Sequence, residues 1–189
     1  MELNFETNLL VAIIISVSTI SQAAFGVGIL LWGTPALMLL NFSFPEALGL
    51  LLPISLLVSG LQFAPNIRKL DVNFIGQFIK FSIPGLTIGL LLVMFVRFHL
   101  NIVIALMLLV VFFMRKNYVS SSLRDLTLKY DRLFMFFTGF SHGISNLGGA
   151  LLVARLSLER YSKNHYRTNV SAAYFVFAAS QLIILVMVN

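Results

Sequence analysis

Cysteine is absent from the 189-residue chain, and charged residues are scarce at 11%. Without cysteine the chain can form no disulfide, no thiolate metal site and no cysteine nucleophile. The charged fraction is far below the roughly 25% of soluble domains, whereas hydrophobic residues make up 59% of the chain and the mean hydropathy is +0.95. These values exclude an ordinary soluble domain and predict an integral membrane protein.

Basic residues are also missing from the amino terminus. The first ten residues, MELNFETNLL, contain Glu2 and Glu6 but no Lys or Arg. They therefore lack the basic region that opens a secretory signal peptide. We expect the first apolar run to stay in the mature protein.

Long apolar runs dominate what is present, at about 8–40, 46–64, 72–96, 100–114, 133–157 and 167–188. Because a helix needs roughly 20 residues to cross a bilayer, the pattern predicts an all-α integral membrane protein, a polytopic helical bundle of about seven to eight membrane segments. The run 8–40 is too long for one span and too short for two full spans with a turn. The run 133–157 raises the same problem, so we interpret both as helix pairs with a break inside the membrane.

Glycine-rich breaks fall at corresponding places in these two runs. One stretch reads SQAAFGVGILLWGTPALM from Ser21, and the other reads SHGISNLGGALLVARLSL from Ser141. A shift of 120 positions superimposes them and aligns Gly28 with Gly148. An internal repeat of glycine-interrupted helices is typical of secondary transporters. The alternative for each glycine alone is close packing between helices.

The repeat predicts two related halves, a first transmembrane half at 1–114 and a shortened second half at 133–189, joined by a polar connector at 115–132. If each interrupted segment crosses as a helix pair, most basic residues lie on one side: Arg68, Lys69, Arg115, Lys116, Arg124, Lys129, Arg132, Arg155, Arg160, Lys163 and Arg167. The positive-inside rule then predicts a multi-pass cell-membrane protein with a cytoplasmic connector and an outside amino terminus. Topology and lipid headgroups account for the net charge of +6, so no nucleic-acid partner is expected.

Polar groups beside the breaks are the candidates for substrate binding. The N–H groups that open a half-helix carry partial positive charge and favour an oxyanion. The candidate residues beside the two expected half-helix starts are Ser21, Gln22, Gly26, Gly28, His142, Ser145, Asn146, Gly148 and Gly149. Their alternative role is interhelical hydrogen bonding, worth about 1 kcal/mol or less per contact.

Lys80 completes the list of candidates. It follows Asp71 by nine residues, which places it roughly 13 Å along a helix and near the midplane of the bilayer. An ionisable residue there is a functional hypothesis, although a lysine can also extend to the interface. Arg155 and Arg167 could form an anion vestibule, but topology alone explains them.

The pentapeptide from Gly139 to Gly143 matches G-x-S-x-G and sets Ser141 beside His142. A nucleophile elbow needs a strand-to-helix turn, and adjacent residues face about 100° apart on a helix. An intramembrane serine hydrolase is therefore the least favoured reading. Since no carboxylate cluster, metal-ligand spacing or phosphate loop occurs, we expect no enzyme activity, cofactor or metal.

The segments FGVGILLWGTPALMLL with FPEALGLLLPISLL, and GFSHGISNLGGALL with KNHYRTNVSAAYFVFAASQL, resemble the sulfite exporter TauE/SafE family of membrane permeases. The resemblance covers most of the chain, although the second motif lacks the counterpart of Pro35. It implies a transporter that moves a small anion, such as sulfite or an organosulfonate, across the cytoplasmic membrane. The expected partners are this anion, the lipid bilayer and a further copy in a homo-oligomer. The alternative is a non-transporting membrane subunit or scaffold.

Overall fold

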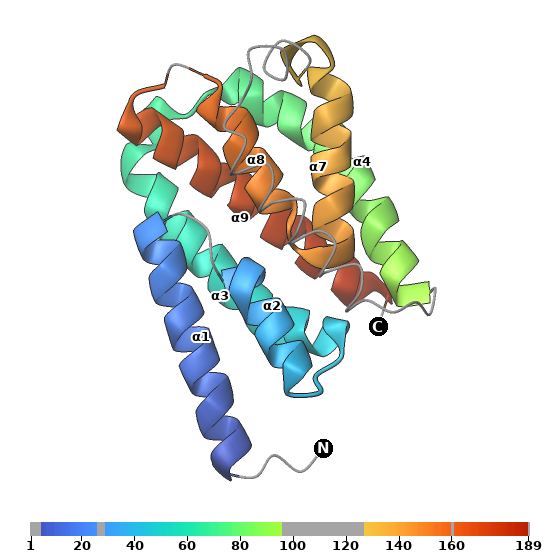
Figure 1. Cartoon of the computed structure of the whole chain (residues 1–189). Helices are drawn as coiled ribbons and strands as arrows, with labels where there is room; N and C mark the ends of the chain where they lie inside the picture. Colours follow the sequence, from blue (N-terminus) through green and yellow to red (C-terminus); the bar gives the residue numbers. More distant parts are fainter. Residues whose placement is uncertain (1–4, 26–28, 96–126, 160, 189) are drawn as a thin grey trace.

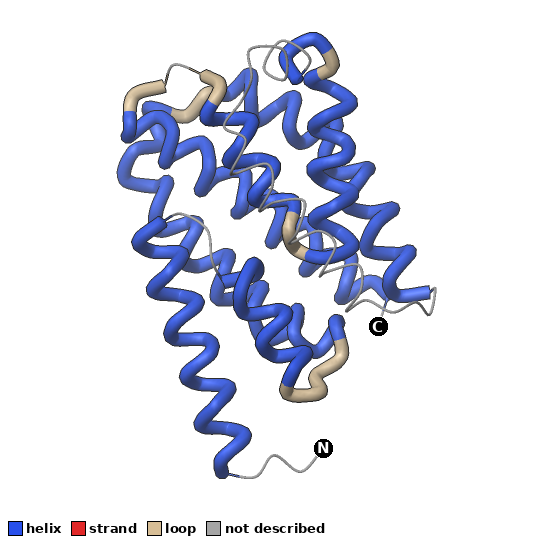
Figure 2. Tube along the Cα trace, viewed as in Figure 1, coloured by secondary structure: helices blue, strands red, loops and turns tan. Residues whose placement is uncertain are grey.

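The computed structural model describes residues 5–25, 29–95, 127–159 and 161–188 (Figure 1). Figure 2 shows that these residues are helical apart from short turns and loops, with no strand among them. The main helices are α1 (Phe5–Phe25), α2 (Ile29–Leu39), α3 (Phe44–Phe63), α4 (Val72–Phe95), α7 (Asp131–Ser145), α8 (Gly148–Ser157) and α9 (Lys163–Val188), with a 3-10 turn η1 (Ala64–Lys69) after α3. The prediction of a helical membrane protein is confirmed.

Among the described residues, four helices are long and apolar enough to cross a membrane, at Phe5–Ala24, Phe44–Lys69, Val72–Phe95 and Lys163–Val188. Two shorter apolar helices, α2 and α8, complete the two interrupted segments. The predicted span at 100–114 and most of the connector 115–132 lie outside the described residues. The count of seven to eight segments and the division into halves stay predictions.

The interruptions fall where the sequence predicts them. Helix α1 ends at Phe25 and α2 begins at Ile29, whereas α7 ends at Ser145 and α8 begins at Gly148. In Figure 1, α1 and α2 form a first hairpin, and α7 and α8 form a second hairpin that runs in the opposite direction. This opposition is the arrangement that an inverted repeat would produce.

Local sequence sets the turn from α2 into α3. Asn41 has a positive φ of 66°, which Asn tolerates better than most residues. Ser43 caps α3, because its hydroxyl accepts the Glu46 N–H at 3.4 Å while the Glu46 carboxylate accepts the Ser43 N–H at 2.7 Å. This capping box begins α3 directly after α2, so the two helices pack antiparallel.

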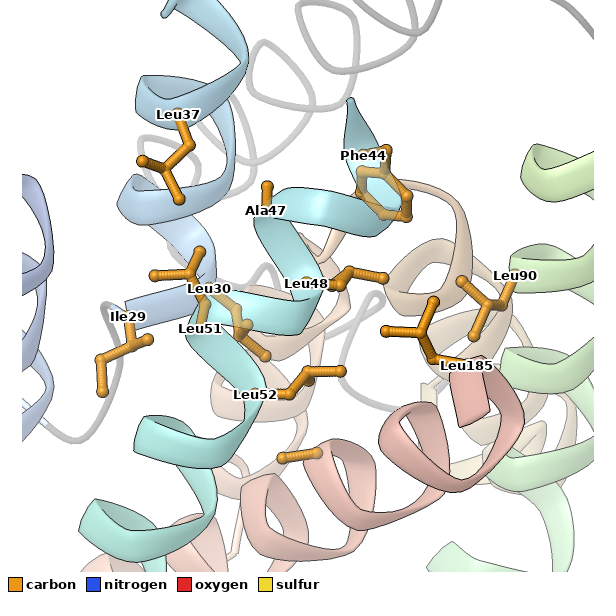
Figure 3. Packing of buried hydrophobic residues seen from close by; sticks show 11 residues of the cluster. Ile29, Leu30, Leu37, Phe44, Ala47, Leu48, Leu51, Leu52, Leu90 and Leu185 are labelled. Carbon is orange, nitrogen blue, oxygen red and sulfur yellow. The ribbon is translucent and has the colours of Figure 1, made fainter. Parts of the chain in front are cut away.

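Two apolar clusters fill the interior. The first joins α2 and α3 to the last turns of α4 and α9, and Figure 3 shows its side chains meeting: Ile29, Leu30, Leu37, Phe44, Ala47, Leu48, Leu51, Leu52, Leu90 and Leu185. The second joins α4 and α7 to α8 and α9, with Phe78 and Phe177 among its members. Because lipid is as apolar as these side chains, close contact stabilises the packing more than escape from water does.

Helix α1 is the most exposed of the four long helices. Only 11% of its apolar window is buried, against 50% for α9. Its outward side chains include Phe5, Val17 and Ile20, which are 83%, 62% and 67% exposed. A bilayer accommodates such a face without a protein partner, because the backbone groups along the middle of a helix are paired within it.

One end of the bundle carries the Lys and Arg residues of the described chain other than Lys80. This end holds η1, the start of α7, the end of α8 and the start of α9 (Figure 1), with Arg68, Lys69, Lys129, Arg132, Arg155, Lys163 and Arg167. Asp71 links two of these elements, since its carboxylate accepts the Tyr161 hydroxyl at 2.6 Å and its N–H donates to Asn169 at 2.9 Å. We call this the basic end. The side of the membrane that it faces stays a prediction.

Candidate functional site

The second hairpin turns at Asn146, which has a left-handed backbone. Its φ is 60°, and its N–H donates to the His142 carbonyl at 2.9 Å, which ends α7. The next N–H, of Leu147, donates to the Ser145 hydroxyl at 3.4 Å. Since few residues other than glycine adopt this backbone and Asn is one of them, the residue type at 146 determines where the break falls.

The Asn146 side chain connects three elements inside the bundle. Its amide nitrogen donates to Thr34 on α2, and its oxygen accepts from Gln181 on α9, both at 2.8 Å. All three residues are at most 1% exposed. The tip of the second hairpin is therefore fastened to the first hairpin and to α9.

Gln22 bonds the start of α2 in the first hairpin and also contacts α3. Its side-chain oxygen accepts the N–H of Ile29, the first residue of α2, at 3.2 Å, and its amide nitrogen donates to Ser59 at 2.9 Å. Gln62 adds a bond to the Gln22 carbonyl at 2.9 Å. Ser21 lies on the same helix and is half-buried with polar contacts of its own. Gly26 and Gly28 lie outside the described residues.

His142 occupies the position in the second hairpin that aligns with Gln22, and its surroundings differ. The side chain is fully buried, and its ring stacks on Phe177 with centroids 4.1 Å apart. Within the described part of the chain, neither ring nitrogen has a hydrogen-bond partner. The Gln181 amide lies beside the imidazole without reaching hydrogen-bonding geometry, and its oxygen is also unpartnered among the described residues.

The start of α8 lies against these groups. A Cβ at Gly148 would collide with the Thr138 carbonyl and with His142, and one at Gly149 would collide with the Tyr174 hydroxyl. Both positions therefore need glycine. The first N–H groups of any helix have no partner within it, so the opening turn of α8 brings donors into the buried region that holds His142. Thr138 contributes a hydroxyl that is buried and unpartnered among the described residues.

Four of the predicted candidates are thus brought together at one place, namely His142, Asn146, Gly148 and Gly149. Ser145 belongs to the same turn and donates to the Ser141 carbonyl at 2.8 Å. Thr34, Thr138 and Gln181 were not predicted from the sequence. Gln181 carried a readable signal, since a buried amide within an apolar run is unusual.

Lys80 lies apart from this cluster. It is exposed on α4, and its ammonium is 5.6 Å from the centroid of the Phe81 ring. The guanidinium of Arg132, in the first turn of α7, is the same distance from that ring. Helical spacing explains the position, because the inward face of α4 is formed by Phe78, Ser82 and Gly85.

Glycines bind α4 and α7 together. A Cβ at Gly139 or Gly143 would collide with the backbone of α4, and one at Gly85 or Gly89 would collide with the backbone of α7. Two facing G-x-x-x-G pairs thus allow the closest approach of helices in the described bundle. The G-x-S-x-G match has its physical explanation here, in helix packing and not in a nucleophile.

Neither candidate vestibule arginine is free. Arg155 is buried and forms ion pairs with Asp131 and with Glu159, the latter at 2.8 Å. Arg167 donates to the Ala23 carbonyl at 2.6 Å. No group of three or more His, Asp or Glu residues suited to a metal ion occurs among the described residues.

Comparison with known proteins gives a family match and no individual relative. No curated protein and no solved structure matches the chain. The family model described as "Sulfite exporter TauE/SafE" matches residues 10–189. The family consists of membrane permeases of the sulfite and anion exporter type, which are transporters and not enzymes. This match covers nearly the whole sequence, so the chain belongs to the TauE/SafE sulfite exporter family.

Proposed function

We propose that the protein carries a small oxyanion, sulfite or an organosulfonate, across the cell membrane and binds it at the start of α8. The observation that carries this proposal is a group of buried polar atoms beside that helix start that have no partner among the described residues: both His142 ring nitrogens, the Gln181 amide oxygen and the Thr138 hydroxyl. Buried polar groups are nearly always paired in proteins. A set of exceptions in one place therefore indicates a ligand.

The chemistry of the site suits an oxyanion. The opening N–H groups of α8 lie at the positive end of the helix dipole, and glycine at 148 and 149 lets this turn pack directly against Thr138, His142 and Tyr174. The Thr138 hydroxyl and a protonated nitrogen of His142 add donors to the oxygens of the anion. In an apolar interior these hydrogen bonds are stronger than in water.

The hydrogen bonds at the tip of the second hairpin bear on how the protein would move during transport. Asn146 joins the second hairpin to α2 and α9, so displacement of one hairpin must break or re-form these bonds. We infer that the two hairpins move against each other around the site, as in transporters built from repeats.

The direct test is flux of labelled sulfite into proteoliposomes, with Asn146→Gly and Asn41→Gly as a matched pair. Both residues have a positive φ, which glycine adopts freely, so each variant keeps its backbone and loses only an amide side chain. Saturable flux in the wild type and in Asn41→Gly, with a loss of at least about tenfold in Asn146→Gly, supports the proposal. Absence of saturable flux from folded wild-type protein contradicts it.

The orientation of the protein in the membrane has a separate test. Because the chain has no cysteine, one introduced cysteine can be labelled selectively. We propose that the basic end is cytoplasmic and the amino terminus outside, by the positive-inside rule. A single cysteine at Arg68 or Glu6 is then the only thiol in the chain. In intact cells an impermeant maleimide should label Glu6→Cys and not Arg68→Cys, and the reverse pattern would invert the topology.

A further inference from the structure

The proposed site contains no permanent positive charge from the described residues. Lys80 is exposed on the outside of α4, Arg155 is already paired with two carboxylates, and Arg167 is bonded to the Ala23 carbonyl. The α8 dipole supplies the equivalent of roughly half an elementary charge. A monovalent anion that enters this buried site is therefore only partly neutralised.

His142 is the group that can supply the missing charge. It is a base that accepts a proton near neutral pH in water, and among the described residues both ring nitrogens are unpartnered and therefore available. Tyr174 on α9 faces it edge-on with ring centroids 6.3 Å apart, and α2 contains no titratable residue. Lys80 of α4 is exposed on the outside of the bundle, and Arg155 of α8 is paired with two carboxylates. No carboxylate from these elements is available to hold a proton on His142 without a ligand.

The first hairpin provides the comparison. There the aligned residue is Gln22, whose amide bonds the start of α2 and Ser59. An amide satisfies a helix start permanently but cannot change its charge, whereas an imidazole can. The second hairpin thus carries a titratable group at the position where the first carries a fixed one.

We propose that the anion and one proton bind together, with the proton on His142, so that transport of a monovalent anion moves no net charge. The anion stabilises the imidazolium, and the imidazolium neutralises the anion in the low-dielectric interior. The empty site then returns with a neutral histidine. This inference rests on the proposed function, since it assigns the coupling proton to the same site.

The first test counts protons by calorimetry. Sulfite is titrated into the purified protein in two buffers that differ in ionisation enthalpy, and the difference in heat gives the protons taken up per anion bound. We expect the wild type and His165→Gln, whose histidine is exposed at the start of α9, to take up about one proton more than His142→Gln. Because all variants receive the same ligand, the protonation of sulfite itself cancels. Equal proton numbers would overturn the inference.

The second test needs only wild-type protein, so it stands even if His142→Gln does not fold. Sulfite flux is measured in proteoliposomes at equal, mildly acidic pH on both sides, where the hydrogen sulfite monoanion predominates, while valinomycin and potassium set the membrane potential. An initial rate that does not respond to the potential supports joint transport with a proton, and a rate driven by the potential overturns it. Failure to bind or carry sulfite at all would reject the proposed function instead, so the two failures differ.

Discussion

The two hairpins differ in how completely they satisfy their own polar groups. In the first, Gln22 bonds the start of α2 and Ser59, and Gln62 covers the next carbonyl. In the second, both ring nitrogens of His142 and the amide oxygen of Gln181 have no partner among the described residues. Among the described residues, a side chain thus bonds the start of α2 but none bonds the His142 ring or the Gln181 oxygen beside the start of α8, although the Thr19 and Ser55 hydroxyls of the first half are also buried and unpartnered.

Unsatisfied buried groups reduce stability by about 1–3 kcal/mol each, so an open break needs support from elsewhere. The second hairpin receives it from two sources, namely the glycine contacts with α4 and the bonds of Asn146 to α2 and α9. The first hairpin has α1 on the outside of the bundle and depends on its own amides. In the proposed function, the second hairpin binds the anion while these contacts with other helices stabilise it.

The largest expected effect comes from the glycine contact that supports the second hairpin. Gly139→Ala places a Cβ against the backbone of Ser82, which cannot rotate away, so α4 and α7 must separate. We expect a loss of about 3 kcal/mol or more, the upper range for overpacking. The measurement is the thermal unfolding midpoint in detergent.

Gly76→Ala is the matched control for this prediction. Gly76 belongs to α4, but nothing lies within 4 Å of a Cβ there, so alanine should be neutral or stabilising by up to about 1 kcal/mol. Equal unfolding midpoints for the two variants would show that the close contact of α4 and α7 does not support the hairpin.

The second effect in size concerns the tip of the second hairpin. Asn146→Ala loses the bonds to Thr34 and Gln181 and forces alanine into a left-handed backbone, and we expect a destabilisation of about 2–4 kcal/mol. Asn41→Ala has the same backbone cost but is exposed, so about 1 kcal/mol should be lost. Chemical unfolding in mixed micelles measures the difference. Similar losses in both would mean that the buried amide contributes no stability.

The sequence predicted the positions of the breaks because their signal is local. Glycine, asparagine and proline act on the backbone within a few residues, so Asn146 and Gly148 could be read directly from the chain. The family resemblance carried by the same segments is likewise confirmed by the match over 10–189. The number of segments remains a prediction, because the apolar run 100–114 lies outside the described residues.

What the sequence could not show is which side chains meet. Lys80 was expected near the site from its depth along α4, but depth does not fix the angular position, and the structure turns it outward. Thr34 and Gln181 contact Asn146 from 112 and 35 residues away, and no local pattern reports such contacts. For the same reason the serine-histidine pentapeptide suggested chemistry where the glycines form a packing face.

A smaller effect on stability is expected at Gln22, the residue of the first hairpin that aligns with His142 of the second. Gln22→Ala removes the bonds to Ile29 and Ser59, and we expect a loss of about 1–2 kcal/mol in unfolding free energy with little change in sulfite affinity. His142→Gln should show the opposite pattern, with stability nearly unchanged and affinity reduced. Calorimetric sulfite binding and thermal unfolding on both variants make the comparison. Loss of affinity in Gln22→Ala as large as in His142→Gln would place part of the binding site in the first hairpin.

The smallest effect is expected at the basic end, where the loop after α8 meets the start of α4. The Tyr161 hydroxyl, followed by the Phe74 N–H, holds the pKa of Asp71 below its ordinary value. A carboxylate with a lowered pKa stabilises the folded state at neutral pH, and this contribution is lost as the pH falls below about 4 and through the folded pKa. Tyr161→Phe should therefore cost about 0.5–1 kcal/mol at pH 7, since Asp71 is partly exposed to solvent, and the cost should shrink in acid. Unfolding midpoints of wild type and variant at neutral and acidic pH measure this difference. A cost that does not change with pH would show that the hydroxyl acts on a partner other than the ionised Asp71 carboxylate.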